Sequence, residues 1–391
     1  MTYHPMKIAF IGQKGIPALS GGVEKHVEKL ATRLAAQGHD VTVYVRSHYT
    51  PVTLREFEGV KLVHVPSIHT KHLDAITHAL CATVHALFVS YDIIHFQSIG
   101  PSILSILPRV MKPKTRVVAT FHSRDYTHKK WGFFARLFLR MAEYATCRIP
   151  ERTIVSSETL IEYAKESYGT DVIFIPSGAE VAFEENTETL TELGLRSKRY
   201  LLAVHRLVPH KGTHYLIKAF KELEDTNRIP NNFKLVIVGA HADTPEYEKF
   251  LKHLAEGRSN IVFAGERTGR AMETLYSHAY LYVQPSEQEG LSLALLEAMG
   301  HGLMPLVSDI EPHKEAVANT GAFFPVKDVD GLKKELAYYV NRSDEVTALG
   351  RIAAERIREH YSWEAVAKKT VEVYRDVLNP DFKGTYVESQ K

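Results

Sequence analysis

The chain has few cysteines and no long apolar run, and both absences narrow the class of protein. Its 391 residues include only Cys81 and Cys147, which cannot form a disulfide framework or a structural zinc site. No stretch of 18 or more uncharged apolar residues occurs that could cross a membrane as a helix. The first residues lack the basic region and cleavage site of a signal peptide. We therefore expect a cytoplasmic protein, or one held peripherally on the inner face of the cell membrane.

Three ligand-binding patterns are also missing. The glycine-rich segment from Gly12 to His26 does not contain G-x-G-x-x-G, the dinucleotide-binding fingerprint. His69, His72 and His78 do not have the spacing of H-E-x-x-H, so a polar surface explains them better than a metal site. No nucleic-acid-binding motif accompanies the basic residues. These absences argue against a dinucleotide-dependent oxidoreductase, a zinc enzyme and a nucleic-acid partner.

The chain does contain a regular alternation of short apolar strands and helical stretches. Residues 7–12 form an apolar run that ends in glycine, and a helical pattern follows it; the same order restarts at residues 199–206. Further strands are expected at residues 41–45, 60–65, 92–96, 116–121, 153–156, 171–175, 233–239, 260–265, 279–285 and 304–308. This alternation predicts parallel βαβ units. We expect an α/β protein of two Rossmann-like domains, residues 1–177 and 178–362, facing across a cleft. A final helix at 363–378 would cross back to the first domain, so that 363–391 packs on it.

Gly21 and Gly22 directly precede the first expected helix. Exposed backbone N–H groups and the helix dipole at such a position attract anions, and phosphate is the obvious candidate. The alternative is that the two glycines only permit a tight turn. The sequence leaves both interpretations open.

The segment HRLVPHKG (205–212) places two cations on the loop after the strand that opens the second half. Ligands of open α/β sheets bind outside the carboxyl ends of the strands, where this loop lies. Arg206 can bind phosphate through two parallel hydrogen bonds, and Lys211 acts as a point charge. The pair indicates phosphate binding, with a solvated surface loop as the alternative.

A third segment, PSEQEGLSLALLEAM (285–299), contains Glu289 and Glu297, separated by seven residues. A helix from Leu291 to Met299 would place Glu297 about two turns in, among apolar side chains. A carboxylate in such surroundings needs a partner, and the hydroxyls of a ribose or a sugar would serve.

Together these segments resemble the family 4 retaining glycosyltransferases, which share the two-domain GT-B fold. The resemblance covers nearly the whole chain, down to YSWEAVA (361–367). The matching segments are the E-x7-E signature at Glu289 and Glu297, the diphosphate clamp in HRLVPHKG, the interdomain strand end in IPSGAE (175–180), the glycine loop at Gly21-Gly22, and TFHS (120–123), whose His122 matches the active-site histidine.

The resemblance implies a role for each matching residue. Glu289 would hydrogen-bond the donor-sugar hydroxyls, and Glu297 would hydrogen-bond the nucleoside ribose. Arg206 and Lys211 would stabilise the leaving nucleoside diphosphate, and His122 would lie against the donor sugar. The implied catalytic residues are His122, Glu289, Arg206 and Lys211, and the implied donor-binding residues are Gly21, Gly22, Arg206, Lys211, Glu289, Gly290, Leu291, Ser292 and Glu297. The nucleotide-sugar is a substrate, and no cofactor is expected.

Asp328-Val329-Asp330 matches the DxD triplet with which other glycosyltransferases hold a metal ion. It directly precedes an expected helix at 332–339, where Asp is a good N-cap. We interpret it as a cap. Arg206 and Lys211 already supply positive charge for a diphosphate, so no metal is expected.

Residues 109–152 carry eleven basic residues against three acidic ones. Such a segment, with bulky apolar residues among its cations, is typical of an interfacial helix on an anionic membrane. The alternative is a core helix with a basic outer face. The residues concerned, within 127–148, are Lys129, Lys130, Trp131, Phe134, Arg136, Phe138 and Arg140.

We therefore expect a retaining, metal-independent glycosyltransferase of the hexosyltransferase type. It would move a sugar from a nucleotide-sugar to a saccharide acceptor, lipid-linked, in surface polysaccharide or glycolipid biosynthesis. The sequence leaves a soluble acceptor open as an alternative. The alternatives are a nucleotide-sugar epimerase of the same fold and a noncatalytic partner subunit that has lost turnover.

Overall fold

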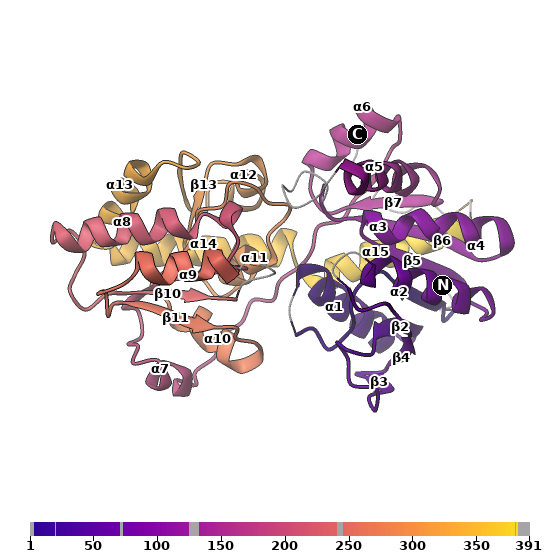
Figure 1. The fold of residues 1–391 in the computed structure, drawn as a ribbon, viewed down its shortest axis with the longest axis horizontal. Coiled ribbons are helices and arrows are strands. Elements are labelled where there is room, and N and C mark those ends of the chain that lie inside the picture. Colours follow the sequence, from indigo (N-terminus) through magenta and orange to yellow (C-terminus); the bar gives the residue numbers. More distant parts are fainter. Residues whose placement is uncertain are drawn as a thin grey trace. The chain divides into compact units, whose positions relative to one another are not determined.

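The computed structural model describes residues 4–19, 21–70, 73–124, 133–240, 245–379 and 381 (Figure 1). The chain divides into two units, Met1–Ser177 with Trp363–Lys391 and Gly178–Ser362. Each unit contains its own sheet. Among the described residues, no helix is both long enough and apolar enough to cross a bilayer.

The N-terminal unit is built on a sheet with the described strand order β3-β4-β2-β1-β5-β6-β7-β8. The pairs are parallel except β3 with β4, which is antiparallel. The strands are β1 (Lys7–Ile11), β2 (Asp40–Arg46), β3 (Glu56–Phe57), β4 (Val60–Val65), β5 (Ile93–Gln97), β6 (Arg116–Phe121), β7 (Arg152–Val155) and β8 (Ile173–Phe174). The helices are α1 (Gly22–Ala36), α2 (Asp74–Leu87), α3 (Ile99–Ser102), η1 (Ile103–Ser105), α4 (Ile106–Met111), α5 (Phe133–Arg148), α6 (Thr159–Tyr168) and α15 (Trp363–Leu378).

The central strand β1 is buried on both faces. Ala9 and Ile11 pack in the same apolar cluster as the alanines of α2. The alternate residue Phe10 lies against His95 of β5, with ring centroids 5.2 Å apart. Because helices cover both faces, the strand is a continuous apolar run, as parallel sheets require.

The last helix, α15, packs on α1 and β6 of the N-terminal unit. Its Tyr374 hydroxyl lies 2.7 Å from His95 Nδ1. At its other end, the Trp363 ring lies edge-on to His26 of α1, 5.5 Å between centroids. The expected return of the chain to its first domain is confirmed.

The C-terminal unit contains a parallel sheet of order β11-β10-β9-β12-β13-β14. Alternate residues of β9 enter two apolar clusters: Leu201 and Ala203 enter one, and Tyr200 and Leu202 enter the other. Both faces of this sheet are therefore covered. The strands are β9 (Tyr200–Val204), β10 (Lys234–Val238), β11 (Ile261–Gly265), β12 (Leu281–Gln284), β13 (Pro305–Ser308) and β14 (Ala322–Phe324). The helices are α7 (Glu188–Glu192), η3 (Pro209–Lys211), α8 (Thr213–Asp225), α9 (Pro245–Leu254), α10 (Gly269–His278), α11 (Leu293–Gly300), α12 (Glu311–Val317), α13 (Val329–Tyr339) and α14 (Ser343–His360).

Candidate active site

The C-terminal sheet has a topological switch point between β9 and β12. From β9 the strand order continues to β10 and β11 on one side, whereas β12 leads to β13 and β14 on the other. The loops that follow β9 and β12 therefore diverge, and open α/β sheets bind ligands at such a point. The first loop carries Arg206 and Lys211, and the second carries Glu289. The structure thus brings together three residues from segments about 80 positions apart.

The two loops contact each other through their backbones. Gly212 has a φ of +70°, and a Cβ at this position would lie 2.0 Å from the Pro285 carbonyl oxygen. The Glu287 amide donates to the His210 carbonyl at 2.7 Å. Only glycine fits this close approach in the left-handed conformation. The position of Lys211, next to Gly212, is therefore fixed by the second loop.

An ion pair joins the loops. Lys211 Nζ lies 2.5 Å from Glu289 Oε2, and the two side chains are only 13% and 7% exposed. The other oxygen, Glu289 Oε1, accepts hydrogen bonds from Gln284 Nε2 and Ser286 Oγ, both at 2.6 Å. Both carboxylate oxygens are therefore satisfied inside the protein.

The ion pair and its neighbours keep Glu289 ionised. Burial by itself would raise the pKa of this carboxyl. The opposing effects of Lys211, His313 and the Ser286 hydroxyl are larger and lower its pKa to about 2. Glu289 is therefore a fixed negative charge at neutral pH, suited to accept hydrogen bonds from hydroxyl groups.

Sequence reasoning missed the groups that hold Glu289 in place. Ser308 Oγ donates to the Ser286 carbonyl at 2.5 Å, and His313 Nδ1 lies 2.9 Å from the Ser308 carbonyl. Burial lowers the pKa of His313, and Glu289 partly opposes this effect. In the described part of the chain, His313 Nε2 is buried without a hydrogen-bond partner. Ser286 was within reach of sequence reasoning, because it is polar and directly follows a buried strand; His313 had no local signal.

Arg206 differs from Lys211. Its side chain is exposed, and no carboxylate in the described ranges pairs with its guanidinium. The preceding His205 is buried, with Nε2 2.7 Å from Thr213 Oγ1. The loop therefore presents the Arg206 charge to solvent while His205 packs inward.

Glu297 lies in α11, which begins two residues later than the sequence predicts. The cause is Ser292, whose hydroxyl accepts from the Leu295 amide and caps the helix. Glu297 therefore lies just over one turn into the helix, and the prediction of two turns is wrong. Its carboxylate is half-buried and accepts a hydrogen bond from the Tyr276 hydroxyl at 3.3 Å.

The residues between Glu289 and α11 connect the two glutamates. Gly290, Leu291 and Ser292 are half-buried. Gln284 Nε2 lies 3.1 Å from Ser292 Oγ and also donates to Glu289. Gln284 therefore links Ser292 of this loop to the Glu289 carboxylate through its hydrogen bonds.

His122 follows β6 in the N-terminal unit. Its Nε2 lies 2.9 Å from Gln97 Oε1, at the carboxyl end of β5. Its ring lies edge-on to that of His26, with centroids 5.0 Å apart. Burial first, and then the neighbouring His26 and His95, lower the pKa of His122 well below its usual value. The imidazole is therefore neutral at pH 7 and can both donate and accept a hydrogen bond.

The glycine pair lies at the switch point of the N-terminal sheet, after β1. Gly21 has a φ of +104°, and Gly22 is the first residue of α1. A Cβ on Gly21 would lie 2.0 Å from Glu24 Oε2. Glu24 is in the first turn of the helix and accepts from the Lys14 amide at 3.0 Å. The turn therefore requires Gly21, and phosphate binding there stays a prediction.

The DxD triplet contains a helix cap, as expected. The Asp328 side chain accepts from the Gly331 amide at 3.0 Å and caps α13. Asp330 pairs with Lys333 at 2.6 Å. This confirms the prediction that the segment caps a helix.

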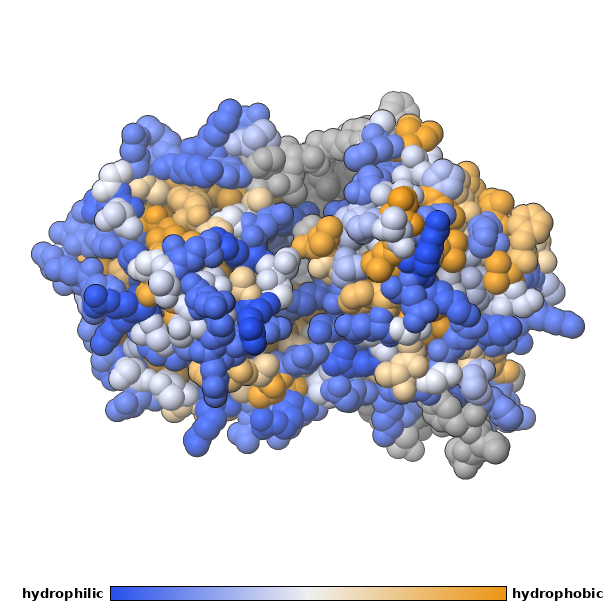
Figure 2. Space-filling view, turned by 90° about the horizontal axis from the view of Figure 1, so that it is seen from below, coloured by the Kyte–Doolittle hydropathy of each residue, from blue (hydrophilic) through white to orange (hydrophobic). Residues whose placement is uncertain are grey.

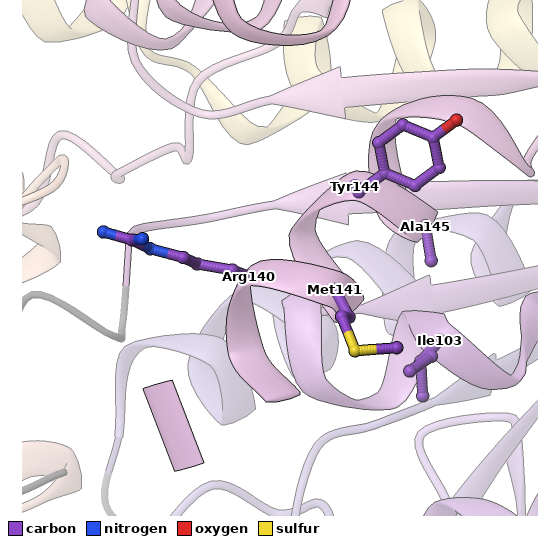
Figure 3. A pocket seen from close by; sticks show the side chains of 5 residues that line it. All are labelled: Ile103, Arg140, Met141, Tyr144 and Ala145. Carbon is purple, nitrogen blue, oxygen red and sulfur yellow. The ribbon is translucent and has the colours of Figure 1, made fainter. Parts of the chain in front are cut away.

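Part of the expected membrane segment lies outside the described residues. Lys129, Lys130 and Trp131 are not described, nor is the side chain of Phe134. The other named residues of this segment, Arg136, Phe138 and Arg140, belong to α5 and are exposed. Figure 2 shows hydrophobic side chains among hydrophilic ones at the surface of the N-terminal unit, to the right in that view. Figure 3 shows the Arg140 side chain extending away from the other residues that line a pocket on this helix.

The buried histidines predict a loss of stability in mild acid. Burial lowers the pKa of His26 to about 4, and the pKa values of His95 and His205 to about 3. At pH values between these folded-state pKa values and about 6.5, the pKa of histidine in the unfolded chain, the unfolded chain binds more protons than the folded chain. The burial of these histidines in their neutral form therefore contributes its full share of stability above about pH 6.5, and that contribution declines as the pH falls. Urea denaturation at pH 7.5 and 5.5 should show a decrease of about 1.4 kcal/mol per histidine in the free energy of unfolding. Equal free energies of unfolding at the two pH values would contradict the lowered pKa values of these histidines.

Two family models match the chain. Residues 187–356 match "Glycosyl transferases group 1", and residues 20–183 match "Glycosyltransferase Family 4". The chain is 25% identical over 371 residues to the phosphatidyl-myo-inositol mannosyltransferase of Mycolicibacterium smegmatis, covering 93% of this chain and 92% of that protein.

Solved structures share the fold. Sucrose-phosphate synthase from Thermosynechococcus elongatus matches with a TM-score of 0.81 and 20% identity, covering 95% of this chain and 99% of the other. HepE of Anabaena, solved in complex with UDP and glucose, matches with a TM-score of 0.77 and 16% identity, covering 95% of this chain and 100% of the other. The two units therefore have the GT-B fold. Within that fold, the chain belongs to the family 4 (group 1) glycosyltransferases, which confirms the resemblance seen in the sequence.

Proposed function

We propose that this glycosyltransferase moves a sugar from a nucleotide-sugar to a lipid-linked saccharide acceptor, with retention of configuration and without a metal ion. The observation that carries the proposal is the position of Arg206, Lys211 and Glu289 on the two loops at the β9/β12 switch point. Two cations and one fixed carboxylate there match a diphosphate joined to a polyhydroxylated sugar.

The diphosphate would bind at the first loop. Arg206 is exposed and has the geometry to hold two phosphate oxygens, while Lys211 supplies a second charge beside it. As the bond between the anomeric carbon and the phosphate oxygen breaks, negative charge develops on that oxygen. Cations already in place stabilise this charge in the way a metal ion would. This is the basis for proposing that the reaction is metal-independent.

The two glutamates would bind different parts of the donor. Glu289 is ionised and held by three neighbours, so it can accept hydrogen bonds from sugar hydroxyls without moving. Glu297, half-buried beside the Tyr276 hydroxyl, would accept from the ribose hydroxyls. Gly290, Leu291 and Ser292 would contact the sugar through their loop, and the backbone amides at Gly21 and Gly22 would approach the phosphate.

The chemical step would take place on one face of the sugar. The acceptor hydroxyl forms a bond to the anomeric carbon as the bond to the donor phosphate breaks, and its proton passes to the leaving phosphate oxygen. Neutral His122 would hydrogen-bond the donor sugar and orient it. No second carboxylate acting as a nucleophile is needed in this scheme.

Two observations support a lipid-linked acceptor. The mycobacterial relative is named for transfer to phosphatidyl-myo-inositol. The outer face of α5 in this chain carries cations beside exposed apolar side chains. An anionic membrane surface is therefore proposed as a partner, and the product would be a glycolipid or a surface polysaccharide precursor.

The purified protein should be incubated with a panel of nucleotide-sugars, with and without lipid-linked and soluble saccharide acceptors, in EDTA. We expect acceptor-dependent release of a nucleoside diphosphate with one donor. Conversion of the donor without an acceptor would favour an epimerase. Activity lost in EDTA and restored by Mg²⁺ or Mn²⁺ would contradict metal independence.

A further inference from the structure

One face of the N-terminal sheet carries a row of polar side chains. The register pairs Gln97 of β5 with Thr120 of β6. Because side chains alternate along a strand, His95 and His122 are expected on the same face, two residues before Gln97 and two residues after Thr120. The hydrogen bonds agree: His95 Nε2 lies 2.7 Å from Thr120 Oγ1, and Gln97 Oε1 lies 2.9 Å from His122 Nε2. The four side chains therefore form two cross-strand pairs, and His95, Gln97 and Thr120 are at most 1% exposed.

Helices α1 and α15 pack over this row. From α1, His26 lies edge-on to the His122 ring, and the Ser177 hydroxyl lies 2.9 Å from His26 Nδ1. From α15, the Tyr374 hydroxyl lies 2.7 Å from His95 Nδ1.

The titratable groups around His122 are neutral at pH 7. Burial lowers the pKa of His26 to about 4 and that of His95 to about 3, and it raises the pKa of Tyr374 well above its usual value. In the described part of the chain, no carboxylate hydrogen-bonds the His122 ring. No neighbour therefore favours the imidazolium form of His122.

The Gln97 amide determines which ring nitrogen of His122 carries the proton. A carbonyl oxygen only accepts hydrogen bonds, so the nitrogen that faces it, Nε2, must be the N–H. A neutral imidazole has one N–H, which leaves a lone pair on Nδ1. Nδ1 has no hydrogen-bond partner among the described residues. It is therefore the ring nitrogen available to a ligand.

The choice of an amide at position 97 points to a functional role. Within the described ranges, Gln97 Nε2 is buried without a partner, a cost that an apolar residue at this strand end would avoid. A carboxylate in its place would favour the imidazolium form, as the aspartate of a catalytic triad does. An amide oxygen accepts the hydrogen bond without adding a charge. Gln97 is therefore suited to orient a neutral imidazole and not to promote proton transfer.

We propose that Gln97 is a positioning residue for the transfer reaction. Its amide oxygen holds the His122 imidazole as the Nε2–H tautomer, and Nδ1 then accepts a hydrogen bond from a hydroxyl of the donor sugar. His26, edge-on to the ring, limits rotation of the imidazole away from Gln97. The inference rests on the proposed function in one respect, that His122 contacts the donor sugar.

The tautomer also restricts the donor sugar. A lone pair on Nδ1 attracts a hydroxyl proton and repels an oxygen atom that carries no proton. The sugar must therefore present a hydroxyl group to His122. A carboxylate at the same position, as in a uronate, is disfavoured.

The first test is nuclear magnetic resonance of the full chain with isotopically labelled histidine nitrogens, because the two tautomers and the imidazolium give different nitrogen shifts. The His122→Gln variant identifies the signals of His122. We expect the Nε2–H tautomer in the wild type between about pH 6 and pH 8, and a mixture of tautomers in Gln97→Leu. The matched control is Ser156→Ala, which removes a hydrogen bond to the His122 carbonyl and leaves the ring contact in place. This variant should keep the tautomer of the wild type.

The second test is the pH profile of turnover, measured with the donor and acceptor that support transfer. Gln97→Leu should lower kcat roughly tenfold at every pH, because the imidazole loses its orientation. Gln97→Glu keeps an acceptor for Nε2–H but raises the pKa of His122. Protonation then places a hydrogen on Nδ1, which can no longer accept. This variant should match the wild type near pH 8 and lose activity as the pH falls toward 6, whereas the wild type and Ser156→Ala should show no such loss.

Three results would overturn the proposal: an Nδ1–H tautomer of His122 in the wild type, an unchanged tautomer and kcat in Gln97→Leu, or the same changes in Ser156→Ala as in Gln97→Leu. The resonance measurement needs no substrate. If it gives the expected tautomers while no nucleotide-sugar is transferred, the role of Gln97 in holding His122 stands and the proposed function fails.

Discussion

Replacing Lys211 with alanine is expected to lower the free energy of unfolding by about 3–5 kcal/mol and to abolish measurable transfer. The substitution leaves Glu289, which is 7% exposed, as a buried charge without its ion-pair partner. It also removes one of the two cations assigned to the leaving diphosphate. From the sequence, Lys211 looks like a surface cation whose loss leaves the fold intact; its burial against Glu289 changes that expectation.

Two further variants separate stability from catalysis at this position. The double variant Lys211→Ala/Glu289→Gln removes both charges, so it should recover most of the lost stability while remaining inactive. Lys252→Ala breaks the more exposed pair with Glu248 in the same unit and should cost at most about 1 kcal/mol. Urea denaturation and a transfer assay measure the two effects. Near-normal transfer by the double variant would remove the ion pair from the mechanism.

Replacing Gly212 with alanine is expected to destabilise the C-terminal unit by about 3 kcal/mol or more and to lower turnover strongly. The residue has a φ of +70°, and the new Cβ would lie 2.0 Å from the Pro285 carbonyl oxygen, a backbone atom that cannot rotate away. The two loops must therefore separate, which moves Lys211 away from Glu289.

The matched control is Gly257→Ala. Gly257 also has a positive φ, of +77°, but a Cβ at this position would have no heavy atom within 4 Å beyond its chain neighbours. The substitution should cost about 1–2 kcal/mol from backbone strain alone and leave turnover unchanged. Equal losses of stability in the Gly212 and Gly257 variants would show that the loop contact contributes nothing.

The sequence was sufficient to predict the parallel strands other than β14, because each of those is a short, continuous apolar run. β1 and β9 show this most clearly, since both their faces are buried. Short or weakly patterned elements were not predicted. β3 and β14 have two and three residues. The buried stripe of α14 includes Gly350 and Ala353, whose small side chains give little periodic signal.

The candidate site shows the same division. The spacing of Glu289 and Glu297, and the two cations of HRLVPHKG, could be recognised along the chain. The difference between buried Lys211 and exposed Arg206 could not be recognised. It depends on how the loop that carries Glu289, about 80 residues away, packs against the loop that carries these two cations. His313 was missed for the same reason: its connection to Glu289 passes through Ser308 and Ser286, on different segments.

The basic and apolar segment within 127–148 could be recognised from the sequence, and α5 forms its part from Phe133 onward. Its alternation of arginines with bulky apolar residues is local and therefore visible in the chain. The apolar side chains that α2 and α4 expose could not be recognised, because their exposure depends on which sides of those helices the fold leaves uncovered. Phe88 and Val110 are as apolar in sequence as many core residues, so only their exposure distinguishes them.

Calorimetric titration of the wild type and the Arg206→Ala variant with nucleoside diphosphates, in EDTA, tests the central claim most directly. Arg206 is exposed and pairs with no carboxylate among the described residues, so its removal should leave the melting temperature unchanged. A charged hydrogen bond to phosphate contributes about 1.5–3 kcal/mol, so the account predicts roughly 10- to 100-fold weaker binding of the diphosphate. Equal affinities of the wild type and the variant would contradict the assignment of the β9/β12 switch point as the diphosphate site.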